Sequence, residues 1–170
     1  MKQLNYNDIL GILNEKLANG GVFFNVNGEN GPNTMTIGWA YMGTSWRKNI
    51  FIAMIRPQRY SFELIEKTGE FTVSVPTKNA LKKELAFAGT KSGRNFNKFE
   101  GHGLTAVPAQ EIETSIVGEC GLHFECRTML TQDMTPDRMA EELVNGTYAP
   151  GDFHTMFFGE ILRCYTTDEE

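Results

Sequence analysis

Apolar and polar residues alternate along much of this chain with the two-residue period of β-strands. The range 34–42 shows the alternation most clearly. Its larger side chains would share one strand face: Met35, Ile37, Trp39 and Tyr41. Further strands are expected over 22–26, 50–55, 70–75, 112–117, 121–130 and 154–165. A turn-rich loop over 27–33 should separate the first two strands.

A few segments follow the 3.6-residue period of helices instead. Ile9, Leu13 and Leu17 predict a helix that begins near residue 7 or 8 and ends before the glycine pair at 20–21. Pro57 suits a helix start, which predicts a second helix over 58–68. Two more are expected over 79–88 and 135–143.

The order of these elements predicts a mainly β fold. Strands outnumber helices, and hairpin-length turns separate them, which favours an antiparallel barrel with a few peripheral helices over a parallel sheet. No repeat, low-complexity tract or long linker divides the sequence, so a single domain over 1–170 is expected.

Composition narrows the function classes. The chain has 170 residues, of which 41% are hydrophobic and 22% charged, as in globular proteins. The formal net charge of −5 argues against nucleic-acid binding, which needs clustered positive charge. No apolar run is long enough to cross a membrane, and the polar N-terminus does not resemble a secretory signal, so a cytoplasmic protein is expected.

The cysteines invite a metal interpretation that their spacing does not favour. Cys120, His123 and Cys126 lie close together in the sequence, but not at CxxC spacing. In a strand, Cys120 and Cys126 would share one face with Leu122 and Phe124, opposite His123. Buried free cysteines are therefore expected, and no metal site is predicted.

Familiar nucleotide and hydrolase motifs are missing, but two cationic segments remain. The first places Arg56, Arg59 and Ser61 at a strand-to-helix turn, where free backbone N–H groups favour phosphate. The second is the polar, glycine-rich stretch 89–103, which contains Arg94 and Lys98. Composition alone leaves a second possibility open: both could be ordinary solvated surface charges.

These segments form part of an ordered set that resembles the flavin reductase-like family, the FMN-binding split-barrel group that includes flavoredoxin. The matching segments are, in order, Asn33-Thr-Met-Thr36, Trp39, Gly43, Trp46, Arg56-Pro-Gln-Arg59-Tyr60, Gly69-Glu-Phe71, Val73-Ser-Val-Pro76, Gly89-Thr-Lys-Ser-Gly-Arg94, Lys98-Phe99, Glu125-Cys126, Gly151-Asp-Phe-His154 and Gly159-Glu-Ile161. Each is weak alone, but the set spans nearly the whole chain. One departure is Ala88, where many flavoredoxin-like members carry a cysteine.

The resemblance implies a six-stranded antiparallel split β-barrel of Greek-key type, usually a homodimer with FMN near the interface. It places a first group of residues beside the flavin: Asn33, Met35, Thr36 and Trp39. A second group would serve the phosphate or ribityl chain: Arg56, Arg59, Tyr60, Ser61, Ser92, Gly93, Arg94 and Lys98. His154 matches a position near the nicotinamide pocket in related reductases. Core packing explains Trp39 equally well, and a structural role explains His154.

The implied activity is that of an NAD(P)H-dependent flavin reductase, in which NADH or NADPH passes hydride to N5 of FMN. Lys98 or Arg94 could place positive charge near the N1 edge of the flavin. The alternative is a non-enzymatic FMN electron-transfer protein reduced by a partner protein. A third possibility is a β-barrel without a cofactor.

Overall fold

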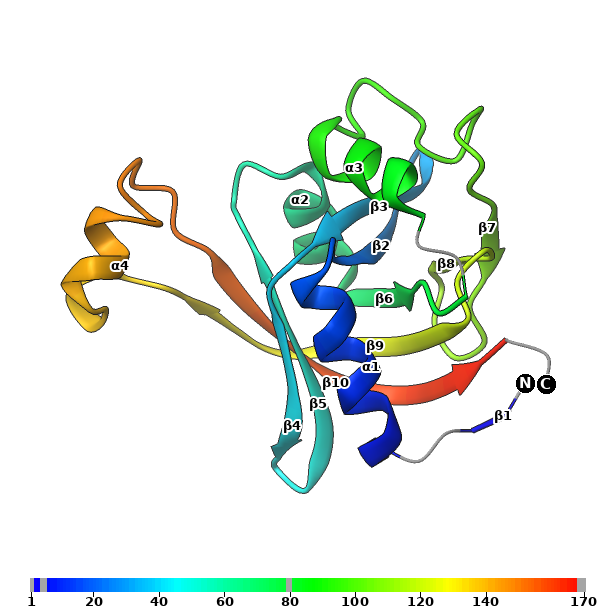
Figure 1. Cartoon of the computed structure of the whole chain (residues 1–170), viewed down its shortest axis with the longest axis horizontal. Coiled ribbons are helices and arrows are strands. Elements are labelled where there is room, and N and C mark those ends of the chain that lie inside the picture. Colours follow the sequence, from blue (N-terminus) through cyan, green and yellow to red (C-terminus); the bar gives the residue numbers. More distant parts are fainter. Residues whose placement is uncertain (1, 4–5, 79–80, 168–170) are drawn as a thin grey trace.

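A large antiparallel sheet dominates the computed structural model, which describes residues 2–3, 6–78 and 81–167 (Figure 1). Its strands are β1 (Lys2–Gln3), β2 (Val22–Gly28), β3 (Gly31–Ile37), β4 (Ala40–Ser45), β5 (Lys48–Ile55), β6 (Glu70–Val75), β9 (Leu122–Asp133) and β10 (Thr155–Thr166). A separate pair consists of β7 (Ala106–Pro108) and β8 (Ser115–Val117). The predicted mainly β, antiparallel fold is confirmed.

The helices are few, as expected. They are α1 (Tyr6–Ala18), α2 (Tyr60–Thr68), α3 (Lys82–Thr90) and α4 (Glu141–Asn145), with a 3-10 turn η1 at Pro136–Arg138. Helix α2 ends where predicted, because Gly69 takes the left-handed conformation that terminates a helix (φ 67°). The first two residues of the predicted helix 79–88 lie outside the described residues, and α3 continues two residues beyond its predicted end.

The main sheet has the strand order β3-β2-β6-β9-β10-β5-β4, with β1 paired to β10. Its two outermost strands, β3 and β4, are consecutive in the chain and are separated only by Gly38 and Trp39. The sheet must therefore curl until its edges come close together. No backbone pairing joins β3 to β4 within the described ranges, so the sheet is not closed, and its seven-strand path differs from the six strands that the resemblance implies.

This curling explains why one predicted strand was wrong. The range 34–42 is not continuous: β3 ends at Ile37 and β4 begins at Ala40, since the chain passes here from one edge of the sheet to the other. Met35 and Ile37 are buried, whereas Trp39 and Tyr41, expected on the same strand face, are 45% and 61% exposed. The expected turn-rich loop 27–33 is also shorter, because Gly28 pairs with Gly31 in a tight hairpin.

Strand β2 is buried on both faces. Phe24 belongs to the main core, where it stacks on Phe71 with ring centroids 5.0 Å apart, and α1 contributes Ile9 and Leu13 to the same core. Phe23 points to the other face and packs in a second cluster with residues of α3. Two covered faces explain why three consecutive residues of this strand, Val22–Phe24, are all apolar.

Strand β9 has the predicted two faces, with one correction. Phe124 and Cys126 face the main core, and His123 lies on the opposite face with its Nδ1 3.1 Å from Ser74 Oγ. Cys120 precedes the strand and packs in the second cluster, so its predicted place on the Cys126 face is wrong. The described cysteines are free, and no group of three His, Cys, Asp or Glu side chains that could hold a metal occurs in the described part of the chain.

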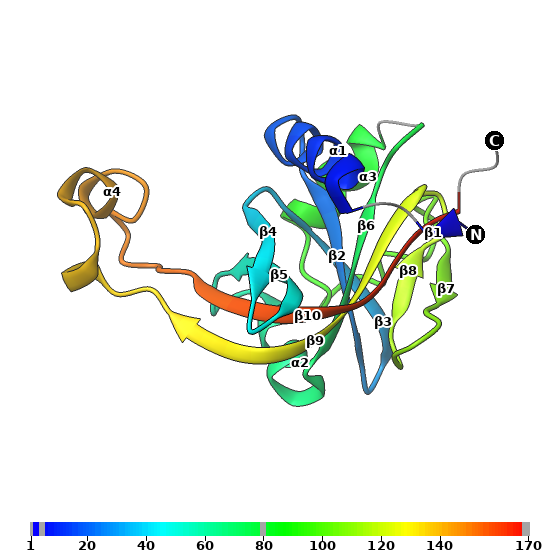
Figure 2. The ribbon, with the colours of Figure 1, turned by 90° about the horizontal axis from the view of Figure 1, so that it is seen from below.

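The hairpin of β9 and β10 extends beyond the rest of the sheet as an arm, whose tip carries α4 (Figures 1 and 2). The predicted helix 135–143 is replaced by η1 and the short α4. The reason is that Met139 and Ala140 take extended backbone conformations (ψ 148° and 139°). None of the helices in the described ranges combines the length and apolarity that a bilayer crossing requires.

Candidate functional site

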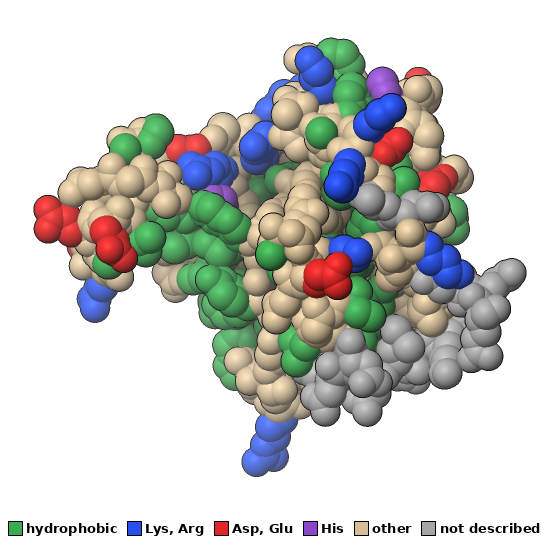
Figure 3. Space-filling model, viewed as in Figure 1, with side chains coloured by type: hydrophobic (Ala, Val, Ile, Leu, Met, Phe, Trp, Pro, Cys, Tyr) green, Lys and Arg blue, Asp and Glu red, His purple; other side chains and the backbone are tan. Residues whose placement is uncertain are grey.

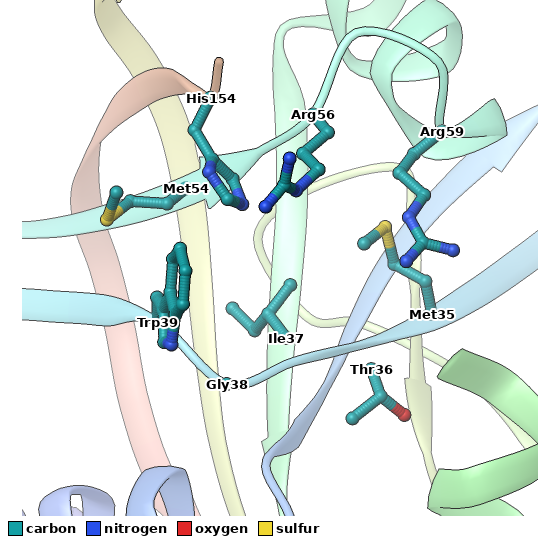
Figure 4. Close-up of a pocket in the computed structure, with 9 residues that line it drawn as sticks. All are labelled: Met35, Thr36, Ile37, Gly38, Trp39, Met54, Arg56, Arg59 and His154. Carbon is teal, nitrogen blue, oxygen red and sulfur yellow. The ribbon is translucent and has the colours of Figure 1, made fainter. Parts of the chain in front are cut away.

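A cavity of about 190 Å³ lies where the two edges of the sheet meet (Figure 4). It is lined by Met35, Thr36, Ile37, Gly38, Trp39, Met54, Arg56, Arg59 and His154. The end of β3, the β3–β4 connection, the end of β5, the β5–α2 connection and the residue before β10 supply this lining, so residues from distant parts of the chain converge there. We call this cavity the ring-end pocket.

An aromatic cluster forms one wall of the ring-end pocket. The His154 ring lies 4.9 Å from the Trp39 ring, and His154 Nδ1 lies 2.8 Å from the hydroxyl of Tyr148. Burial, and secondly the Arg56 guanidinium, lower the pKa of His154 from 6.5 to about 4. The imidazole is therefore neutral at pH 7, and one ring nitrogen remains a donor while the other accepts.

Arg56 is fixed between the pocket and the segment that precedes β10. Its Nη1 donates to the backbone oxygen of Asp152 and lies 2.9 Å from Asp152 Oδ2. The guanidinium also lies over the Tyr148 ring, 5.4 Å from its centroid. Gln58 donates to the same carboxylate. Arg56 is thus held at a defined position, with part of its charge balanced by Asp152.

A second cavity of about 140 Å³ adjoins the first and shares Met35 and Arg59 with it. It lies between the start of α2 and the segment 88–98, and we call it the phosphate-end pocket. Its lining is Met35, Gln58, Arg59, Tyr60, Ser61, Ala88, Thr90, Lys91, Ser92, Gly93, Arg94 and Lys98. Lys and Arg side chains gather on the surface around α2 and α3 (Figure 3). Two arginines, two lysines and hydroxyl groups beside a helix start form a donor set suited to phosphate.

Internal bonds hold several of these donors in place. Ser61 Oγ accepts a hydrogen bond of 2.8 Å from Asn33 Nδ2, and Arg59 Nη1 donates to the backbone oxygen of Gly89 at 3.1 Å. Arg94 pairs with Glu63, and its guanidinium lies 5.3 Å from the Tyr60 ring centroid. The phosphate-end pocket is therefore preorganised by its own contacts.

Lys98 is the most buried cation of the site, with only 4% of its surface exposed. Its Nζ donates to the backbone oxygens of Thr34 and Ala88, at 2.7 and 2.9 Å. An ammonium group has three N–H donors, so one remains for a ligand. Burial, and secondly the charge of Arg59, lower the pKa of Lys98 from 10.5 to about 8.

Gly93 allows the polar segment to approach β3 closely. A Cβ atom at this position would lie 2.0 Å from Asn33 Oδ1 and 2.8 Å from Tyr60 Cδ1. No L-residue with a side chain fits there without moving one of those neighbours. Close packing against Asn33 and Tyr60 therefore explains why this position of the motif is a glycine.

The structure brings all the predicted site residues together around the two pockets. Asn33, the one that lines neither, is bonded to Ser61 of the phosphate-end pocket. Sequence reasoning missed Met54, which lines the ring-end pocket, and Tyr148, which lines neither of these two pockets but contacts His154. No motif marks these two residues, since Met54 lies within an apolar strand and Tyr148 is brought to the site only by the fold.

Comparison with known proteins gives a family. The flavin reductase like domain model matches residues 16–170. An uncharacterized protein of Archaeoglobus fulgidus is 34% identical over 81% of this chain and 67% of its own length. An uncharacterized protein of Pyrococcus abyssi is 33% identical over 68% of this chain, which spans only 55% of that protein.

Solved structures agree with this assignment. Flavoredoxin of Desulfovibrio vulgaris (Miyazaki F) is 25% identical, with a TM-score of 0.69 over 87% of this chain and 70% of that one. An NADH:FAD oxidoreductase of Streptomyces globisporus shares the fold at 15% identity, with a TM-score of 0.65 over 98% of this chain and 87% of that one. From the domain match and these relatives, the chain belongs to the flavin reductase-like family.

Proposed function

We propose that this chain binds FMN across the two adjoining pockets and acts as an NAD(P)H-dependent flavin reductase. The observation that carries the proposal is the donor set of the phosphate-end pocket, directly continuous with a cavity walled by aromatic and apolar side chains. A phosphate needs clustered N–H and O–H donors, and a flat ring system needs an apolar slot with a few polar groups. The phosphate-end pocket provides the donors, and the adjoining ring-end pocket provides the apolar slot.

In this proposal, Arg59, Ser92 and Arg94 hold the phosphate. Arg59 lines both pockets and stands between them. Lys98 contributes its remaining N–H and its positive charge from the buried wall of the phosphate-end pocket. The fixed positions of these groups lower the entropy that binding must overcome.

At the ring end, Met35, Trp39 and Met54 supply apolar surface and exclude water. When bound, FMN supplies the redox chemistry, because its isoalloxazine ring can accept and pass on two electrons. When the Tyr148 hydroxyl donates to Nδ1 of the neutral His154, the ring carries its proton at Nε2. His154 then offers a neutral donor on the pocket wall, at the position where we propose that the nicotinamide enters.

A second candidate, an FMN electron carrier reduced by a partner protein, is favoured by the similarity to flavoredoxin. The purified protein, loaded with FMN and freed of excess, distinguishes the two. Loss of flavin absorbance on anaerobic addition of NADH or NADPH supports the reductase. Loss that requires an added partner reductase supports the carrier, and no binding of FMN in calorimetric titration would refute flavin binding altogether.

We also propose that the chain forms a homodimer through the apolar surface beside the arm. Exposed large apolar side chains come from β4, the β4–β5 turn, β9 and α4: Tyr41, Trp46, Met129, Leu130 and Leu143. An apolar area lies between the β4–β5 hairpin and the arm (Figure 3). Such surfaces commonly mark contacts between protein chains. A monomeric mass in light scattering would refute this proposal.

A further inference from the structure

Positive charge dominates the lining of the ring-end pocket. Arg56 and Arg59 are its charged side chains at pH 7, since His154 is neutral there, and the described lining includes no carboxylate. Lys98 and Arg94, which sequence reasoning suggested as charges near the N1 edge of the flavin, line the phosphate-end pocket instead. The ring end of the site therefore depends on its two arginines for positive charge.

The two arginines of the ring-end pocket differ in their surroundings. Arg59 is exposed and donates to the backbone oxygen of Gly89, at the boundary with the phosphate-end pocket. The Arg56 side chain is only 22% exposed, and Figure 4 shows its guanidinium beside the His154 ring. Because less water surrounds Arg56, its charge is screened less. Arg56 is therefore the stronger electrostatic influence on a ring bound in this pocket.

Asp152 pairs with Arg56 but lines neither pocket. Its Oδ2 lies 2.9 Å from Arg56 Nη1, and its side chain is 29% exposed. Both charges reach the pocket wall: burial lowers the pKa of His154 most, Arg56 lowers it further, and Asp152 raises it. The carboxylate therefore offsets part of the positive charge that Arg56 presents to the cavity.

We propose that Arg56 stabilises the reduced form of bound FMN and that Asp152 limits this effect, so that the ion pair sets the reduction potential of the flavin. The inference rests on the proposed flavin site. Hydride transfer breaks a C–H bond of NADH or NADPH, forms the N5–H bond of the flavin and leaves NAD⁺ or NADP⁺, so the flavin gains one negative charge. A fixed cation beside the ring favours the state that carries this charge. Asp152 is then a positioning residue, which acts by holding Arg56 and offsetting its charge.

The reduction potential of bound FMN, measured anaerobically at pH 7 against a reference dye, tests this with two opposite expected signs. Arg56→Met should weaken the binding of reduced relative to oxidised FMN about tenfold, which lowers a two-electron potential by about 30 mV. Asp152→Asn should strengthen it about tenfold and raise the potential by about 30 mV. Arg56→Lys, which keeps the charge, should stay within about 10 mV of the wild type.

The matched controls make the same changes of charge in an ion pair that lines neither pocket. Arg127 pairs with Glu70 there, at 3.0 Å. Arg127→Met and Glu70→Gln should both leave the potential within about 10 mV of the wild type. Equal shifts in these controls would mean that the overall charge of the protein, and not the Arg56 pair, sets the potential.

Several other results would overturn the inference. Shifts of the same sign in Arg56→Met and Asp152→Asn would indicate lost packing, and no shift in Asp152→Asn would remove its role. A Lys98→Met variant that lowers the potential while Arg56→Met does not would assign the charge to Lys98. If Arg56→Met binds no FMN, the sign found for Asp152→Asn decides alone. A wild type that binds no FMN in calorimetric titration would refute the proposed function and this inference with it, whereas bound FMN whose potential ignores both substitutions would refute the inference alone.

Discussion

The pKa of Lys98 gives the sharpest test of the phosphate-end pocket. Burial and the neighbouring Arg59 lower this pKa from 10.5 to about 8. Because one pKa unit corresponds to about 1.4 kcal/mol, charging Lys98 costs about 3 kcal/mol more in the folded protein than in the unfolded chain. A phosphate dianion in the same pocket would favour the charged form and raise the pKa again.

This predicts a specific dependence of FMN affinity on pH. Below about pH 8 Lys98 already holds its proton, so FMN binds without proton uptake. Above that pH the lysine of the free protein is neutral, and binding must take up a proton. The Kd for FMN should therefore rise with pH, by up to about tenfold per pH unit. Calorimetry between about pH 7 and 9.5, in buffers of different ionisation enthalpy, measures both the affinity and the protons taken up.

The decisive variant is Lys98→Met, which removes the charge but keeps the length of the side chain. It should bind FMN more weakly at pH 7 and lose the rise of Kd above pH 8. Lys91→Met is the matched control, since Lys91 lines the same pocket but is exposed. That variant should keep the pH dependence. A pH dependence that persists in Lys98→Met, or a wild-type Kd that is flat across this range, would refute the reasoning.

Two further predictions concern stability. The pKa of His154 is lowered from 6.5 to about 4, so the unfolded chain binds the proton first and stability should fall as the pH drops between these values, by up to about 3 kcal/mol. His154→Phe should lack this loss when urea unfolding at pH 4 and pH 7 is compared, and an equal loss in both proteins would contradict the assignment. Gly159→Ala should destabilise by about 1–3 kcal/mol, because the new Cβ would lie 2.5 Å from the Phe71 ring and 2.9 Å from Cys126 Cβ. Gly43→Ala, which meets nothing within 4 Å, is the control, and thermal unfolding that shows equal effects would mean that the Phe71 contact yields easily.

The bounds of a strand were predicted well where a single physical rule determines them. Strand β6 has the predicted bounds, because alternating apolar residues between a glycine and a proline leave little choice. The same rule was wrong between 34 and 42, where alternation continues but pairing stops. Whether a strand ends there depends on which edge of the sheet each half joins, and that is a property of the whole topology.

The site was predicted as a set of residues, while their roles depend on contacts that the sequence does not encode locally. Arg56, for example, was expected to serve the phosphate or the ribityl chain. In the fold it is paired with Asp152 and lines the ring-end pocket rather than the phosphate-end pocket. The partner lies 96 positions away along the chain. Only the pairing of β5 with β10 brings the two together.

Lys98 shows most clearly why burial changes the meaning of a sequence motif. In the sequence it is one cation of a polar, glycine-rich stretch, and a solvated surface charge was a reasonable alternative. In the fold it is enclosed between β3 and the end of α3, where two backbone oxygens accept its hydrogen bonds. A solvated lysine would keep its ordinary pKa and would leave FMN affinity independent of pH near 8. The pH dependence of binding therefore separates the two interpretations that the sequence left open.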